Sequence, residues 1–67
     1  MTADSLLEDL RHSRTDLSAL VEKVRDTRRD LVIVSAHAVD AWRVREPDAW
    51  RKVHEWLATE GVAVRVI

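Results

Sequence analysis

The chain has no cysteine, phenylalanine or tyrosine, and it has one glycine and one proline in 67 residues. The lack of cysteine excludes disulfides, thiolate zinc sites and a cysteine nucleophile. A single glycine is too few for a glycine-rich phosphate loop. Disordered and loop-rich chains contain far more glycine and proline than this. We therefore expect one small folded domain, residues 1–67, with no cofactor and no evident small-molecule substrate.

The charges are dense but balanced, with 11 basic and 12 acidic residues and a formal net charge of −1. Domains that neutralise phosphates normally carry a net basic charge, so nucleic acid is not the expected partner. No apolar run approaches the ~20 residues of a membrane span. The first 14 residues are too acidic and too interrupted for a signal peptide. The composition favours a cytoplasmic protein with no membrane contact.

The small size of the chain indicates that it needs a partner for stability. A chain this short buries only about 60% of the surface that its unfolded form exposes. Small scaffolds compensate with disulfides, a metal or oligomerisation. Disulfides are excluded here and no set of metal ligands stands out in the sequence. We therefore expect a homo-oligomer or a complex with a partner protein.

The first 30 residues have the pattern of a long amphipathic helix. The segment Ser5 to Glu8 matches a capping box, with Thr2 and Asp4 as competing caps. A break is possible over residues 12–16, where Ser and Thr could cap a second helix. One continuous helix is favoured because the apolar stripe keeps its phase across that segment. The stripe is formed by Ala3, Leu6, Leu7, Leu10, Leu17, Leu20, Val21 and Val24.

Two interpretations of this stripe remain open. It packs against the chain's own sheet, or it continues as heptads (positions 3, 7, 10, 14, 17, 21, 24, 28 and 31) and forms a dimerisation helix. Both hold if the stripe is wider than one sheet can cover. Candidate interface residues on the stripe are Leu10, Leu17, Val21 and Val24.

Residues 31–67 read as a strand, a helix and a second strand. The run 31–34 is continuously apolar, which is typical of a strand buried on both faces of a parallel sheet. Pro47 suits the first position of a helix, and Gly61 suits the position just after its end. Residues 62–67 form the second strand, and this order implies a parallel crossover. The predicted class is α/β, with the sheet completed by oligomerisation or by a partner.

The segment 35–45 is ambiguous. A hairpin with the first strand would need an Asn-Gly or Asp-Gly turn, which is missing, so a loop or a short helix is preferred. Trp50 and Trp56 lie on the apolar side of the second helix and are assigned to the core. Trp42 is expected to be partly exposed. Since tryptophan is enriched at interface hot spots, Trp42 is the best single contact candidate.

Candidate chemistry is sparse. Ser35, His37 and Asp40 follow the first strand, where sites of open α/β sheets are found. His37 and Asp40 could serve as base and orienter, but a metal site would need further ligands. His54-Glu55 begins a zinc-helix motif that fails at Ala58. We therefore assign no catalytic, cofactor or metal residue, and the balance leans away from an enzyme.

Two family resemblances follow from these segments. Residues 31–35, Leu-Val-Ile-Val-Ser, and residues 61–66, Gly-Val-Ala-Val-Arg-Val, resemble the first strand–helix–strand unit of phospholipase-D-like domains. The His-x-Lys pair of that family is absent, so the resemblance implies the fold without the active site. Residues 17–34 are similar to the helix and strand of Phd/YefM-type antitoxins, without the opening strand and turn glycine of that family.

The expected function is a non-enzymatic interaction, assembly or regulatory module. Two alternatives stay open. One is an antitoxin-type regulator that binds DNA. The other is a degenerate or fragmentary phospholipase-D-like hydrolase domain.

Overall fold

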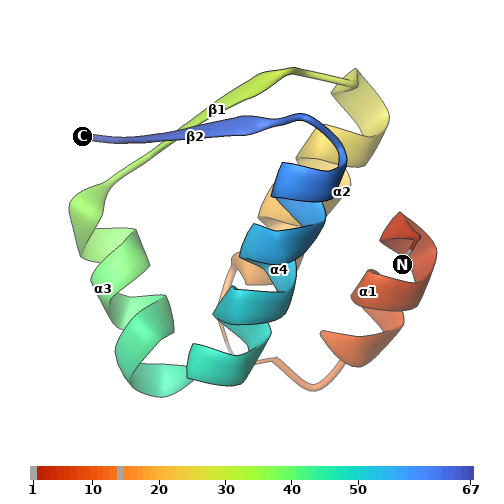
Figure 1. Cartoon of the computed structure of the whole chain (residues 1–67). Helices are drawn as coiled ribbons and strands as arrows, with labels where there is room; N and C mark the ends of the chain where they lie inside the picture. The colour runs from red at the N-terminus through yellow and green to blue at the C-terminus, as the bar shows by residue number, and fades with distance from the viewer. Residues whose placement is uncertain (1, 14) are drawn as a thin grey trace.

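Helices lie on one side of a two-stranded parallel sheet in the computed structural model of the chain, which describes residues 2–13 and 15–67 (Figure 1). This arrangement confirms the predicted mixed α/β class. Along the chain the elements are α1 (Ala3–Asp9), α2 (Leu17–Thr27), β1 (Leu31–Val34), α3 (Ala36–Arg45), α4 (Pro47–Thr59) and β2 (Ala63–Val66).

The two strands pair in parallel, with Leu31 beside Ala63 and Val34 beside Val66. This confirms the predicted crossover. Burial alternates along β1, however, so its expected burial on both faces is wrong. Val32 and Val34 face the helices, whereas the side chains of Leu31 and Ile33 lie on the exposed face. Among the described residues, the four helices cover only one side of the sheet.

Local signals set both ends of α4 as predicted. Pro47 occupies its first turn, where a missing N–H costs nothing. Gly61 follows the helix with a φ of 73°. Its N–H donates to the carbonyl of Ala58, and the N–H of Val62 donates to the carbonyl of Leu57. These two bonds form a Schellman motif, which turns the chain directly into β2.

The predicted single N-terminal helix is wrong, because the chain breaks between α1 and α2. A helix of 25 residues would be about 38 Å long, but the molecule extends only 27 Å along its longest axis. The break lets α1 fold back to contact both α2 and α4 (Figure 1). The cap of α1 is Thr2, whose hydroxyl accepts from the N–H of Ser5, so the Ser5–Glu8 capping box does not form. Arg14, one of the heptad positions, lies outside the described residues.

Polar side chains of the connection between α1 and α2 hold the break in place. The hydroxyl of Ser13 donates to Glu46 at 2.7 Å, and that of Thr15 donates to the same carboxylate oxygen. Asp16 accepts a 3.1 Å hydrogen bond from the indole N–H of Trp42. These bonds span about thirty residues of sequence and tie the connection to the corner between α3 and α4. A straight helix would not deliver these side chains to that corner.

The ambiguous segment 35–45 is the helix α3, in agreement with the preferred alternative. The hydroxyl of Ser35 accepts from the N–H of Ala38 at 3.0 Å and so caps this helix. The carbonyl of the last residue, Ile67, accepts from the N–H of Ala36, which extends the contact between β2 and this junction. The position of Ser35 after β1 is therefore explained by its capping role.

The core lies between the helices and the inner face of the sheet. The expected partial exposure of Trp42 is wrong, because Trp42 is only 3% exposed. Its ring stacks on Trp50 with centroids 5.2 Å apart. Trp50 and Trp56 are buried as predicted. The buried apolar residues are Leu6, Leu10, Leu17, Val21, Val24, Val32, Val34, Val39, Trp42, Trp50, Val53, Trp56, Leu57 and Val62.

Candidate interaction surface

The five residues predicted to form an interface are all inside the core of the chain. Each of them is at most 4% exposed, and all five belong to the same hydrophobic cluster. The apolar stripe is therefore covered by the chain's own sheet and helices, as in the first of the two interpretations. None of these side chains offers surface to a partner in this fold. The five are Leu10, Leu17, Val21, Val24 and Trp42.

The residues considered for catalysis do not assemble into a site. His37 and Asp40 both lie exposed on α3, and no hydrogen bond joins them. Over residues 2–13 and 15–67, no group of three or more His, Asp or Glu side chains is placed to hold a metal. His54 is exposed and lies edge-on to the ring of Trp50, at a centroid distance of 5.5 Å. The exposed His37 and Asp40 give no reason to assign hydrolytic chemistry.

Three arginines border a hollow of about 440 Å³ next to Trp56, namely Arg25, Arg28 and Arg29. Arg25 bonds to Asp26 at 3.0 Å and to Asp4 at 3.2 Å. The hydrogen bond to Asp26 and the negative charge of that carboxylate raise the pKa of the Arg25 guanidinium. Arg25 is therefore already satisfied by acids from the chain itself. The hollow also contains Glu60, which opposes an anion.

The outer face of the sheet carries large apolar side chains that none of the helices in the described part of the chain covers. Leu31 is 42% exposed, Ile33 is 58% exposed and Ile67 is 72% exposed. Soluble chains expose many single apolar residues, but these share one sheet face because strand residues two apart point the same way. Arg65 lies on the same face, opposite Ile33 in the register. The outer face is therefore apolar along β1 and carries one cation on β2.

Both strands are edge strands, so each has a free row of backbone groups. Ala63 donates to the carbonyl of Asp30, and Ile67 donates to that of Val34. In a parallel ladder alternate residues of each strand bond to the neighbour. The N–H and C=O groups of Leu31 and Ile33 therefore point to the free edge of β1. By the same pattern, those of Val64 and Val66 point to the free edge of β2.

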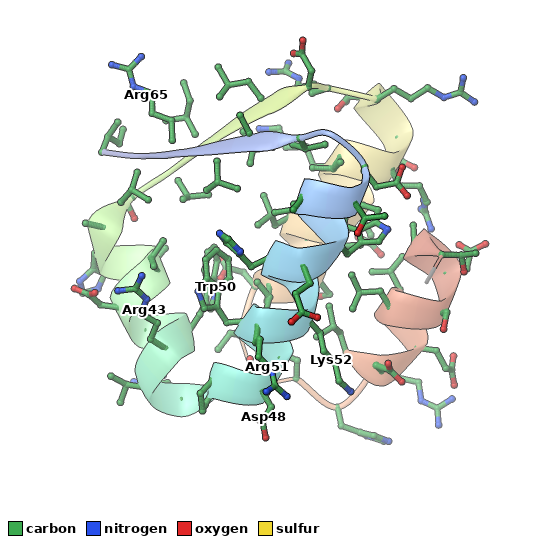
Figure 2. All side chains as sticks on the ribbon, viewed as in Figure 1. Arg43, Asp48, Trp50, Arg51, Lys52 and Arg65 are labelled. Atoms are coloured by element: carbon green, nitrogen blue, oxygen red, sulfur yellow. The ribbon has the colours of Figure 1, made fainter. Side chains whose placement is uncertain are left out.

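A groove of about 420 Å³ runs between β2, α3 and α4. Figure 2 shows Trp50 in the opening that these three elements frame, with Arg43 projecting from α3 and Arg51 from α4. The apolar lining consists of Val39, Trp50, Val64 and Val66, and the polar lining of Arg43, Arg51, His54 and Glu55. In the described part of the chain, neither Arg43 nor Arg51 is in a salt bridge. The groove therefore has an apolar floor and a predominantly basic rim.

Sequence reasoning missed these surface residues. The spacing of Leu31 and Ile33 gives a signal, since apolar residues two apart on a short strand share one face. It did not reveal which face the helices leave open. Arg43 and Arg51 lie on different helices and approach one groove because the chain turns at Glu46, between α3 and α4. No spacing rule connects them.

Comparisons with known proteins identify no relative: no family model, no curated protein and no solved structure matches the chain. Among the described residues, no helix combines the length and the apolar character that a membrane span requires.

Proposed function

We propose that this chain is a non-enzymatic interaction module that completes its sheet with a second copy of itself. The observation that carries the proposal is the apolar, uncovered outer face of β1 next to a free strand edge. Exposed edges of this kind are normally shortened, charged or covered in soluble proteins. β1 has no charged residue within Leu31–Val34 to discourage pairing.

The total exposed area supports incomplete burial. Folded monomers of 7.7 kDa are expected to expose about 4300 Å². This chain exposes 4760 Å², which is about a tenth more. A standard interface removes about 800 Å² from each partner. Removing that much would bring the exposed area of each chain below the expectation for a lone monomer.

The free edge of β1 suits a twofold antiparallel pairing centred on Val32. In that register Leu31 of each copy faces Ile33 of the other. The outward N–H and C=O groups of these residues then form four hydrogen bonds, each contributing about 1 kcal/mol. The apolar cross-strand pairs add roughly 0.2–1 kcal/mol each. Stacking the outer faces of two copies is disfavoured in comparison, because it would bury Arg65.

Sedimentation velocity from 1 to 100 µM tests the proposal. We expect a concentration-dependent shift from monomer to dimer, because four hydrogen bonds and a small apolar patch support only weak association. Ile33→Glu is expected to shift the equilibrium at least tenfold toward monomer, because it places a carboxylate beside the second copy's Leu31. A chain that remains monomeric up to 100 µM would refute the proposal.

Val44→Glu is the matched control. Val44 is also a β-branched residue and is 82% exposed, but it lies on the helix α3 and not on either strand. The two variants add the same charge at exposed apolar positions, so a general effect of charge would shift the monomer–dimer equilibrium equally in both. Dissociation by Val44→Glu to the same extent as by Ile33→Glu would place the contact elsewhere. Circular dichroism establishes that each variant is folded.

A further inference from the structure

We propose that the groove between β2, α3 and α4 binds an acidic peptide segment in extended conformation, which adds to β2 as a third strand. This site lies on the opposite edge of the sheet from the β1 contact proposed above, and it does not depend on that contact. Its basis is a free strand edge, an apolar floor and arginines without acidic partners, all at one place (Figure 2).

The backbone of β2 provides the strand contact. Its odd-numbered residues bond to β1, as the bonds from Ala63 and Ile67 show. Val64 and Val66 therefore present their N–H and C=O groups outward, at the spacing that an added strand requires. Adding an extended peptide to such an edge is a recurring mode of recognition, in which main-chain hydrogen bonds give affinity and flanking pockets give specificity.

The floor of the groove provides an apolar contact for the peptide. Side chains of Val64 and Val66 line it, and Val66 is 50% exposed. Trp50 forms the base, held by its stack on Trp42 and by the edge contact with His54. Successive residues of a strand point to opposite faces. Every second side chain of a bound peptide would therefore enter the groove, and an aliphatic residue suits the central position.

The charges around the groove select acidic neighbours for that aliphatic residue. Arg43 and Arg51 line the groove, and Arg65 lies on the opposite face of β2 (Figure 2). Over the described residues, none of these three guanidinium groups is in an ion pair. Glu55 is the single carboxylate among the lining residues. Carboxylates pointing inward would meet Arg43 and Arg51, and a carboxylate pointing outward would meet Arg65 across the strands.

A peptide fits better than the other polyanions. The free edge of β2 offers alternating N–H and C=O groups, and only another polypeptide strand matches both. A second copy of this chain is opposed by charge, because antiparallel pairing of two β2 edges with the most hydrogen bonds would place Arg65 opposite Arg65. The free strand edge and the arginines of the groove together therefore favour an acidic segment of another protein.

Fluorescence anisotropy tests the inference with a fluorescein-labelled peptide of eight residues. The peptide has one leucine, at a central position, and glutamate elsewhere. We expect binding in the range of tens to hundreds of micromolar, weakened by salt because the charges are exposed. Replacing every glutamate with lysine should abolish it. Equal binding of the lysine peptide would overturn the inference, as would tighter binding of a single-stranded oligonucleotide of equal charge.

The double variant R43E/R51E locates the site. It should weaken peptide binding at least tenfold, whereas R11E/R45E should change it less than twofold. The control reverses two exposed arginines outside the groove, so both variants have the same net charge. Equal loss in both would show a general charge effect and refute the site. Backbone amide spectra should also show the largest peptide-induced shifts at Val64 and Val66, and shifts confined to β1 would contradict the proposed edge.

Sedimentation separates this inference from the proposed self-association. R43E/R51E should leave the monomer–dimer equilibrium unchanged. L31E should shift that equilibrium toward monomer but leave peptide affinity unchanged, because Leu31 pairs with Ala63 and not with Arg65. If R43E/R51E altered self-association instead of peptide binding, the groove would be a contact between copies and the inference would fail.

Discussion

Replacing Arg28 with glycine is expected to stabilise the chain. Arg28 ends α2 with a φ of 51° and a ψ of 40°, in the left-handed region. Its N–H donates to the carbonyl of Val24 at 2.9 Å, so it occupies the position that glycine normally takes in this type of helix end. In the part of the chain that the structure describes, Arg28 is the one non-glycine residue with a positive φ. Its side chain is exposed and in no ion pair within that part.

The size of the effect follows from two opposing terms. The left-handed conformation costs a residue with a Cβ about 1–2 kcal/mol. Glycine in turn loses about 0.5–1 kcal/mol more backbone entropy on folding. The difference predicts a gain of about 0.5–1 kcal/mol in the free energy of unfolding. For a domain of this size, 1 kcal/mol corresponds to roughly 4–8 °C in Tm.

Urea unfolding followed by circular dichroism, at one fixed protein concentration, measures the change. The midpoint should rise while the slope m stays constant. Arg29→Gly is the matched control, because Arg29 is the neighbouring exposed arginine and has no positive φ. That substitution should lower stability by about 0.5–1 kcal/mol. If Arg28→Gly also lowered stability, the explanation based on the backbone conformation of Arg28 would be refuted.

Three further changes test other contacts, each measured by urea unfolding against the unmodified chain. Asp16→Ala should cost about 1–3 kcal/mol, since it leaves the buried indole N–H of Trp42 without its acceptor; no loss would mean that water replaces the carboxylate. Glu46→Ala should lower the free energy of unfolding by about 1–3 kcal/mol, because it removes the acceptor of the Ser13 and Thr15 hydroxyls. The same change should speed amide exchange in the connection between α1 and α2. Unchanged exchange would contradict the role given to those bonds. Val44→Lys should change stability by less than about 0.5 kcal/mol, because Val44 is almost fully exposed, and a larger loss would reveal a contact of Val44.

Elements with signals at their own ends were predictable from the sequence. Pro47 and Gly61 bracket α4, and each acts through backbone geometry that depends only on its neighbours. The β-branched runs before and after this helix then predicted two strands joined by a parallel crossover. Such signals need no knowledge of the rest of the fold.

The N-terminal break was not predictable in the same way. The leucines of α1 and α2 enter one core, so the apolar stripe keeps its phase even though the chain changes direction between Leu10 and Leu17. The groups that stabilise the break, Glu46 and Trp42, lie about thirty residues away in the sequence. The same distance explains the misjudged burial of Trp42. Its helix also exposes Val44, so its apolar side could not be assigned from the helical pattern.

The sequence predicted that part of the sheet would stay uncovered, but not where the uncovered surface would lie. The short chain and its apolar strands indicated that it has too few helices to cover both faces of the sheet. The face and the edges left open depend on where the helices pack, which the strands do not encode. The groove depends on the corner at Glu46, which brings Arg43 and Arg51 to one opening.

The position of β2 at the end of the element order has a consequence for folding kinetics. α3 and α4 meet through one junction residue and form contacts that are local in sequence. The pairing of β1 with β2 must instead close a loop from Val34 to Ala63, and the entropy of loop closure opposes that step. Folding rates fall as contacts become less local. We therefore expect the pair α3–α4 to be organised in the transition state for folding, with the sheet forming last and its edges becoming available only when folding is nearly complete.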